Sequence, residues 1–233
     1  MTALVAQTRA EVLMTLRRGE SLLLTLGIPV GLLVFFSLID LGFTKGDPVD
    51  FVAPGVLALA VMSTGMVSLG IATGFERQYG VLKRLGTTPL GRPRLLGAKT
   101  AAIVLLEVVQ VAVLVPIALV LGWDPLGNAG AALLAALIGT VAFAGLGLLM
   151  AGALRAEVTL AAANGLYLLF LLLGGMVIPL DKLPGAMETV AHLLPGAALS
   201  EILHDTASSG DWVVLVLWAV AAPLAAALTF RWE

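Results

Sequence analysis

The chain has 233 residues, of which 60% are hydrophobic and only 12% are charged, and its mean hydropathy is +1.05. Soluble domains carry about 25% charged residues, so this composition excludes a soluble globular enzyme, a disordered chain and a nucleic-acid binder that relies on bulk positive charge. The absence of cysteine excludes a disulfide scaffold, a thiolate metal site and a cysteine nucleophile. The class that remains is an all-α polytopic membrane protein.

An amphipathic segment, residues 1–20, precedes the first apolar run. Its polar and apolar side chains separate onto opposite faces at helical spacing, with Arg18 on the polar face and Arg9 and Arg17 on the flanks. Such a helix is expected to lie flat in the inner membrane interface, with its arginines reaching lipid phosphates. It is either a membrane anchor or a contact surface for a cytoplasmic partner.

Six apolar windows are long enough to cross about 30 Å of hydrocarbon as helices. Their only formal charges are Asp40, at the end of the first window, and Glu107, inside the third. We therefore predict six transmembrane helices in a single transmembrane domain that covers residues 1–233. The windows are residues 21–41, 51–75, 100–121, 129–154, 158–180 and 212–230.

The charges between these windows are distributed unequally. If the N-terminus lies inside, only Lys45 and Lys182 of the 13 Lys and Arg residues fall on the outer side. Cytoplasmic loops of membrane proteins carry an excess of Lys and Arg. Both termini are therefore predicted to be cytoplasmic.

The stretch between the second and third windows, residues 76–99, is both charged and patterned. Apolar residues at helical spacing predict a short helix, with Lys83 and Arg84 on another face. Gly86 is positioned to end this helix, and Pro89 follows as a helix breaker. The stretch is either a positive anchor that only fixes topology or a knob that docks into another protein.

The outer segment before the last window, residues 181–211, contains two short helical patterns. Pro184 is positioned to begin the first helix, and Pro195 breaks it before the second. Each is too short to span a bilayer, so we expect paired interfacial or re-entrant helices that cap the outer face. His192 and His204 show no metal-ligand spacing and are predicted to be solvated loop residues.

Glu107 is the one ionisable residue well inside a predicted span. A carboxylate at that depth costs at least about 2.5–3.5 kcal/mol on insertion scales, so it should face protein or water, or be protonated. Gln110 follows three residues later on the same helical face. The pair either lines a cavity for a cationic or hydroxylated substrate or forms a buried, hydrogen-bonded packing pair.

Taken together, these features resemble the type-2 ABC-transporter permeases, the membrane subunits of ATP-driven exporters. The likeness covers nearly the whole chain, including the amphipathic helix and the six spans. The resemblance implies two ABC ATPase (nucleotide-binding) subunits, a dimer with a second copy or a paralogous permease, and export by alternating access. It rests on the loop pattern Glu76-Arg77-x-x-Gly80-x-x-x-x-Leu85-x-x-x-Pro89 ending at Lys99, and on the outer pattern Pro179-x-x-x-Leu183-Pro184, followed by Pro195 and Glu201.

The sequence carries no phosphate-binding loop of the form Gly-x-x-x-x-Gly-Lys-Ser/Thr, so it cannot hold ATP in that way. The resemblance accordingly implies no cofactor in this chain, with ATP and Mg bound by the ATPase subunit. It implies that the ATPase contacts the N-terminal helix and the 76–99 loop. The implied contacts are charged side chains (Glu76, Arg77, Lys83 and Arg84), an open backbone at Gly80, the return to the third span at Pro89, and the helix arginines Arg9, Arg17 and Arg18.

The resemblance also places the second and fifth spans near the dimer axis and the substrate path. Met62 and Met66 share a face of the second span, and Asn164 and Tyr167 share a face of the fifth. Methionine suits a tolerant apolar cavity because it is flexible and polarizable. The same spacing is typical of simple helix packing, and both interpretations stay open.

Three functions fit a polytopic membrane protein. The resemblance favours a permease that exports an amphipathic drug-like compound or a lipid. An ion-coupled secondary transporter would need several charged or broken mid-membrane helices, and an intramembrane enzyme would need polar side chains converging at one depth; the sequence offers few of either. The abundance of Ala, Leu, Gly and Val is typical of GC-rich bacterial genomes, so we expect the bacterial cell membrane, with lipids and no nucleic acid as partners.

Overall fold

The computed structural model describes residues 3–17, 23–39, 47–86, 92–125 and 127–230. Helices dominate these ranges, and no strand occurs in them. Five helical segments are long and apolar enough to cross a membrane: Pro48–Gln78, Arg94–Val120, Ala129–Ala153, Ala156–Leu173 and Ser209–Thr229. The prediction of an all-α polytopic membrane protein is therefore confirmed.

The first predicted span corresponds to a shorter apolar helix, Thr25–Ser37. It is made of η1 (Leu23–Gly27) and α3 (Ile28–Ser37). Its neighbours in the chain, residues 18–22 and 40–46, lie outside the described ranges. The count of six spans therefore stays a prediction.

The later helices follow the predicted windows closely. Each window from the second to the sixth contains long helical structure, and the 76–99 loop and the outer segment contain short helices. In chain order these are α4 (Pro48–Met62), η2 (Ser63–Ser68), α5 (Leu69–Gln78), α6 (Val81–Gly86), α7 (Arg92–Val120), α8 (Ala129–Ala153), α9 (Ala156–Leu173), η3 (Leu180–Lys182), α10 (Gly185–Ala191), α11 (Pro195–Leu203) and α12 (Ser209–Thr229).

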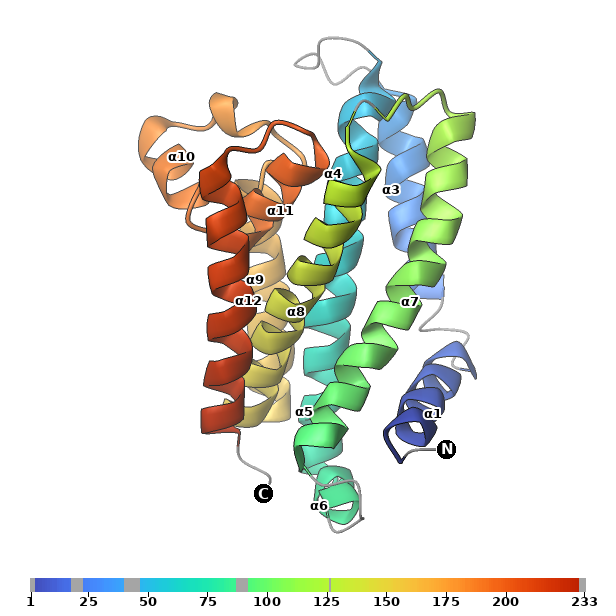
Figure 1. Ribbon diagram of the computed structural model, residues 1–233, viewed down its shortest axis with the longest axis vertical. Helices are drawn as coiled ribbons and strands as arrows, with labels where there is room; N and C mark the ends of the chain where they lie inside the picture. The colour runs from blue at the N-terminus through green and yellow to red at the C-terminus, as the bar shows by residue number, and fades with distance from the viewer. Residues whose placement is uncertain (1–2, 18–22, 40–46, 87–91, 126, 231–233) are drawn as a thin grey trace.

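The long helices form one bundle with distinct ends (Figure 1). Both chain ends lie at one end of the bundle, which is also the end that carries α6, while α10 and α11 lie at the opposite end. This arrangement is the one expected when both termini are on the same side of a membrane. Their cytoplasmic location stays a prediction.

The N-terminal helix, α1 (Ala3–Arg17), lies beside the part of α7 nearest the α6 end (Figure 1). Thr8 is buried in this contact, and Glu11 is mostly covered. Val5 and Met14 remain exposed on the other side. The polar face of α1 is therefore turned toward the protein, and the exposed apolar side is the one that a membrane interface would cover.

The centre of the bundle depends on close backbone contacts with α8. A Cβ atom added at Gly70 of α5 would lie 3.1 Å from Cα of Gly147, and one added at Gly147 would lie 2.7 Å from the carbonyl oxygen of Met66. Such small-residue contacts stabilise helix pairs in lipid through dispersion, since lipid chains are as apolar as the side chains. Phe143 and Phe170 fill the adjacent core.

The predicted pair of short outer helices is confirmed as α10 and α11. Pro195 is the first residue of α11, where its missing N–H has no helical role. The prediction of a solvated loop residue is wrong for His204. Its Nε2 lies 2.9 Å from the carbonyl oxygen of Phe51, and its ring packs on the Phe51 ring, because the end of α11 rests on α4. His192 is exposed.

Candidate functional site

The first part of the candidate site is the turn that joins α5 to α7, which we call the α6 elbow (residues 76–86). α5 ends at Gln78, and α6 begins at Val81 after Gly80 adopts φ +71°. Glycine enters this left-handed region without steric cost. Apart from Gly80 and its two neighbours in the chain, no described residue has an atom within 4 Å of the position where a Gly80 Cβ would stand, so the backbone is open to close approach.

The α6 elbow has one face on the bundle and one face outside it. Leu82 is fully buried against Leu95 of α7, and Leu85 packs beside them. Lys83 and Arg84 are exposed, as the sequence pattern predicts. Helix α6 ends at Gly86, while Pro89 lies outside the described residues.

Arg77 is directed into the bundle. Its guanidinium donates hydrogen bonds to the carbonyl oxygens of Gly152 and Leu154, at the end of α8. The last carbonyls of a helix have no partner within it, so Arg77 satisfies groups that would otherwise be left unpaired. The α6 elbow is thereby fixed to the α8–α9 connection, and an ATPase contact for Arg77 stays a prediction.

We expect Arg77→Ala to lower the free energy of unfolding by about 2 kcal/mol, because hydrogen bonds from a charged donor contribute about 1.5–3 kcal/mol. Chemical unfolding of the detergent-purified protein, followed by circular dichroism, measures the change. Arg94→Ala is the matched control, since Arg94 is an exposed arginine at the same end. Equal losses in the two variants would contradict the capping role.

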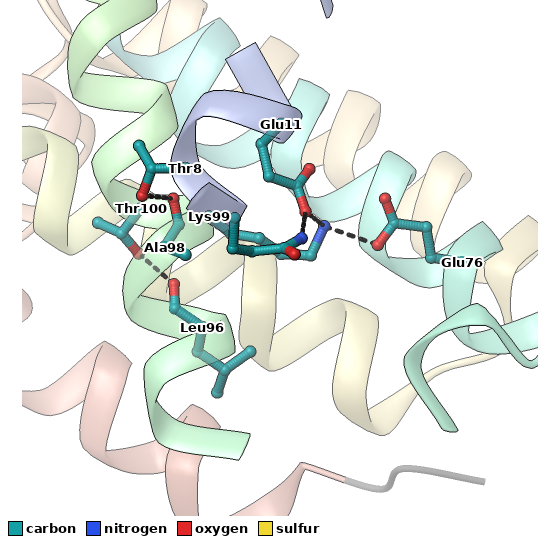
Figure 2. A network of polar contacts seen from close by, with 8 residues as sticks. Thr8, Glu11, Glu76, Leu96, Ala98, Lys99 and Thr100 are labelled. Atoms are coloured by element: carbon teal, nitrogen blue, oxygen red, sulfur yellow. Dashed lines mark hydrogen bonds and ion pairs between the residues drawn. The ribbon is translucent and has the colours of Figure 1, made fainter. Parts of the chain in front are cut away.

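A buried ion-pair network lies next to the α6 elbow (Figure 2). Lys99 Nζ lies 3.1 Å from Glu11 Oε1 and 2.6 Å from Glu76 Oε2, and the lysine side chain is only 2% exposed. Figure 2 shows the two carboxylates approaching the ammonium from different helices. Because the three residues belong to α1, α5 and α7, the Glu11–Lys99–Glu76 network joins all three elements.

The N-terminal arginines are only partly described. Arg9 is exposed on α1, and the contact of Thr8 with Ala98 holds the helix on α7. The side chain of Arg17 and the whole of Arg18 lie outside the described residues. Their proposed contacts with an ATPase therefore stay predictions.

The second part of the candidate site is a cavity of about 340 Å³ between α4, α7 and α8. It extends from the α7–α8 connection, at Trp123 and Asn128, to Glu107, which lies midway along the Arg94–Val120 span. Both Glu107 and Gln110 line it. The structure thus brings these two candidate residues together, as their spacing predicts.

The two polar side chains differ in how they are satisfied. Gln110 accepts a hydrogen bond from Thr64 at 3.0 Å and donates one to the carbonyl oxygen of Thr25 at 2.9 Å. Glu107 accepts a hydrogen bond from Thr140 at Oε2, whereas Oε1 has no partner in the described part of the chain. Gln110 is therefore hydrogen-bonded to two other helical segments, and Glu107 retains an acceptor without a described partner.

The other candidate path residues lie elsewhere. Met62 and Met66 are fully buried in the core with Phe143. Asn164 is exposed on α9 and donates to the carbonyl oxygen of its own helix, and Tyr167 is half-buried. None of these four residues lines the cavity, and their role in a substrate path stays a prediction.

Sequence reasoning missed the partners of the charged residues. Lys99 and Glu76 gave a signal, since each stands directly at the edge of an apolar window, whereas Glu11 lies within the amphipathic segment and gave none. Thr140 gave none, because a threonine in a helix commonly bonds to a carbonyl of its own preceding turn. Only the packing of α8 on α7 places Thr140 beside Glu107.

Comparison with known proteins yields one family. The sequence model of the family described as ABC-2 type transporter matches residues 2–206, which include the α6 elbow and the cavity residues. No curated protein matches the chain.

Proposed function

The chain belongs to the ABC-2 type transporter family, and on that premise we propose that it is the membrane-spanning permease subunit of an ATP-driven exporter. Permeases of this family are transmembrane components without a nucleotide-binding site of their own, and membership implies partnership with an ABC ATPase subunit. In this proposal the ATPase subunits bind ATP and Mg, and a second permease, identical or paralogous, completes the assembly.

The observation that carries the proposal is the α6 elbow. It is a short, partly exposed helix at the end of the bundle where the described cations gather, whereas Lys182 is the only described cation at the opposite end. This imbalance supports a cytoplasmic location for that end. The exposed cations at the end that carries the α6 elbow are Arg9, Lys83, Arg84, Arg94 and Arg155, and Arg77 and Lys99 lie there with their side chains more buried.

The contacts of the α6 elbow supply a route by which ATPase movement would reach the spans. Arg77 attaches it to the end of α8, and the Glu11–Lys99–Glu76 network attaches it to α7 and α1. A push on α6 would therefore displace several helices together, because a packed interior transmits strain. We propose that this movement drives alternating access for an amphipathic drug-like compound or a lipid in the bacterial cell membrane.

The test reverses the two exposed charges of the α6 elbow, Lys83→Glu with Arg84→Glu. Like charges placed across an interface cost several kcal/mol, so we expect ATP-driven transport to fall at least about tenfold. The variant is reconstituted with its ATPase in lipid vesicles, and transport of a fluorescent phospholipid and of an amphipathic dye is followed together with ATP hydrolysis. The variant spares Arg77 and Glu76, whose contacts lie within the chain.

Lys182→Glu is the matched control, because Lys182 is an exposed lysine at the opposite end of the bundle. It should transport like the unmodified protein. Unchanged transport in the double variant would contradict docking at the α6 elbow. Transport by the permease alone, without ATPase or ATP, would overturn the exporter proposal and favour an ion-coupled carrier.

A further inference from the structure

Four of the five described ionisable side chains that line the cavity between α4, α7 and α8 are carboxylates, and the fifth is His204, which contacts the carbonyl oxygen of Phe51. Asp50, Asp124 and Asp205 line it near the α7–α8 connection, and Glu107 lines it in mid-span. Asp50 Oδ1 accepts a hydrogen bond of 3.1 Å from the backbone N–H of Asp124, which joins the start of α4 to the α7–α8 connection. Among the described residues that line the cavity there is no lysine or arginine.

Glu107 differs from the three aspartates because it is buried and lies in mid-span. Its side chain is 6% exposed, and one of its two carboxylate oxygens has no hydrogen-bond partner among the described residues. A buried carboxylate without full compensation is strongly unfavourable in apolar surroundings, so a proton, a hydrogen-bond donor or a positive charge at Oε1 would stabilise it. The Gln110 amide donates to the carbonyl oxygen of Thr25, and no described donor reaches Oε1 of Glu107.

The remaining walls fit the body of an apolar ligand. Leu57, Val111, Val115 and Leu133 line the cavity, and Trp123 stands where α7 ends. A volume of about 340 Å³ falls in the usual range of small-molecule sites, about 300–1,000 Å³. The cavity thus combines an acidic end, an apolar wall and one buried acceptor.

A metal ion is a poorer match for these groups. Metal sites gather several ligands around one point, and no group of three or more His, Cys, Asp or Glu side chains suited to a metal occurs in the described residues. Glu107 lies in mid-span, away from the three aspartates near the connection. A single carboxylate at the end of an apolar chamber suits one ammonium group on an apolar body.

We propose that the cavity binds an amphipathic organic cation, with its protonated amine at Oε1 of Glu107 and its apolar body against the walls formed by α4, α7 and α8. That this ligand is the exported cargo rests on the proposed function, whereas its binding is a property of this chain alone. The uncharged relatives of such a ligand, which lack the amine, should bind weakly because they leave the Glu107 acceptor unsatisfied.

The test uses two fluorescent probes that differ only in charge. Dansylcadaverine carries a primary amine that is protonated at pH 7, and N-pentyl dansylamide has the same fluorophore and chain without the amine. Each is titrated into the purified permease in lipid nanodiscs, without ATPase or ATP, and empty nanodiscs give the blank. We expect the amine probe to bind at least about tenfold more tightly. Equal affinities would overturn the proposal.

Glu107→Gln identifies the residue responsible. It should reduce affinity for the amine probe at least about tenfold and leave affinity for the neutral probe unchanged. Asp181→Asn is the control, since Asp181 is an exposed acid that does not line this cavity. Unchanged affinity of Glu107→Gln for the amine probe would refute the placement of the amine at Glu107. If that variant does not fold, the difference in affinity between the two probes for the unmodified protein decides whether the cavity binds a cation.

The binding test and the transport test fail in different ways. Equal affinities for the two probes would contradict the cation site but would not affect the proposal that an ATPase docked at the α6 elbow drives transport. Loss of ATP dependence would overturn the exporter and leave the cation site standing. The two proposals are therefore separable on the same purified protein.

Discussion

Replacing Lys99 with methionine is expected to lower the free energy of unfolding by about 3–5 kcal/mol, the loss typical when one partner of a buried ion pair is removed. The lysine is 2% exposed and lies between Glu11 and Glu76, at 3.1 and 2.6 Å. Methionine keeps most of the side-chain volume but leaves two carboxylates close together without their cation. Both burial and mutual repulsion then act against the folded state. Chemical unfolding in detergent measures the loss.

Two further variants distinguish the effect of losing the Lys99 charge from the effect of changing side-chain packing. Lys182→Met removes a lysine from an ion pair with Asp181 whose side chains are 55% and 69% exposed, and it should change stability by about 1 kcal/mol or less. Adding Glu11→Gln and Glu76→Gln to Lys99→Met removes the two uncompensated charges and should restore much of the lost stability. If Lys99→Met were as stable as Lys182→Met, the network would have no structural role.

The Glu11–Lys99–Glu76 network also bears on the residues that the family resemblance implies in ATPase contact. The family resemblance assigns Glu76 and Arg77 to the ATPase interface, yet both side chains make contacts within this chain. Lys83 and Arg84 remain exposed on the α6 elbow. We propose that the exposed side of α6 faces the ATPase and that Glu76 and Arg77, at the end of α5, transmit the resulting movement to the neighbouring helices.

The hydrophobic pattern predicted the architecture because membrane insertion constrains sequence strongly. Long apolar windows had to become helices, since a backbone in lipid must satisfy its own hydrogen bonds. The same pattern predicted the short helix before Gly86 and the break at Pro195, where glycine and proline chemistry is local. These features depend on residues close together in the chain.

Contacts between distant helices could not be predicted in this way. Gln110 and Glu107 share a face, but whether each is satisfied depends on Thr64 and Thr140 in other helices. Similarly, the helical spacing of Met62 and Met66 is equally compatible with a cavity wall and with the core, and packing against α8 and α9 placed them in the core. Sequence periodicity identifies a face of a helix, and only the tertiary fold supplies its neighbours.

Gly145→Ala tests whether the backbone contacts of α8 hold the bundle together. A Cβ atom at this position would lie 2.5 Å from the backbone nitrogen of Pro223, 2.6 Å from its Cδ and 2.8 Å from the carbonyl carbon of Ala222. All three are backbone or ring atoms of α12, so no flexible side chain can move aside. We expect the variant to lose about 3 kcal/mol of stability, at the upper end of ordinary overpacking.

Gly165→Ala is the matched control, because the same glycine-to-alanine change is expected to leave stability unchanged or to raise it. Gly165 lies within α9, and apart from its chain neighbours and the nearby backbone of α9 no described atom stands within 4 Å of its Cβ position. Alanine there should leave stability unchanged or raise it by about 0.5–1 kcal/mol, because glycine loses more chain entropy in a helix. Unfolding of both variants in the same detergent makes the comparison. If Gly145→Ala behaved like Gly165→Ala, α8 and α12 would not be in backbone contact, and the bundle would have to be packed in another way.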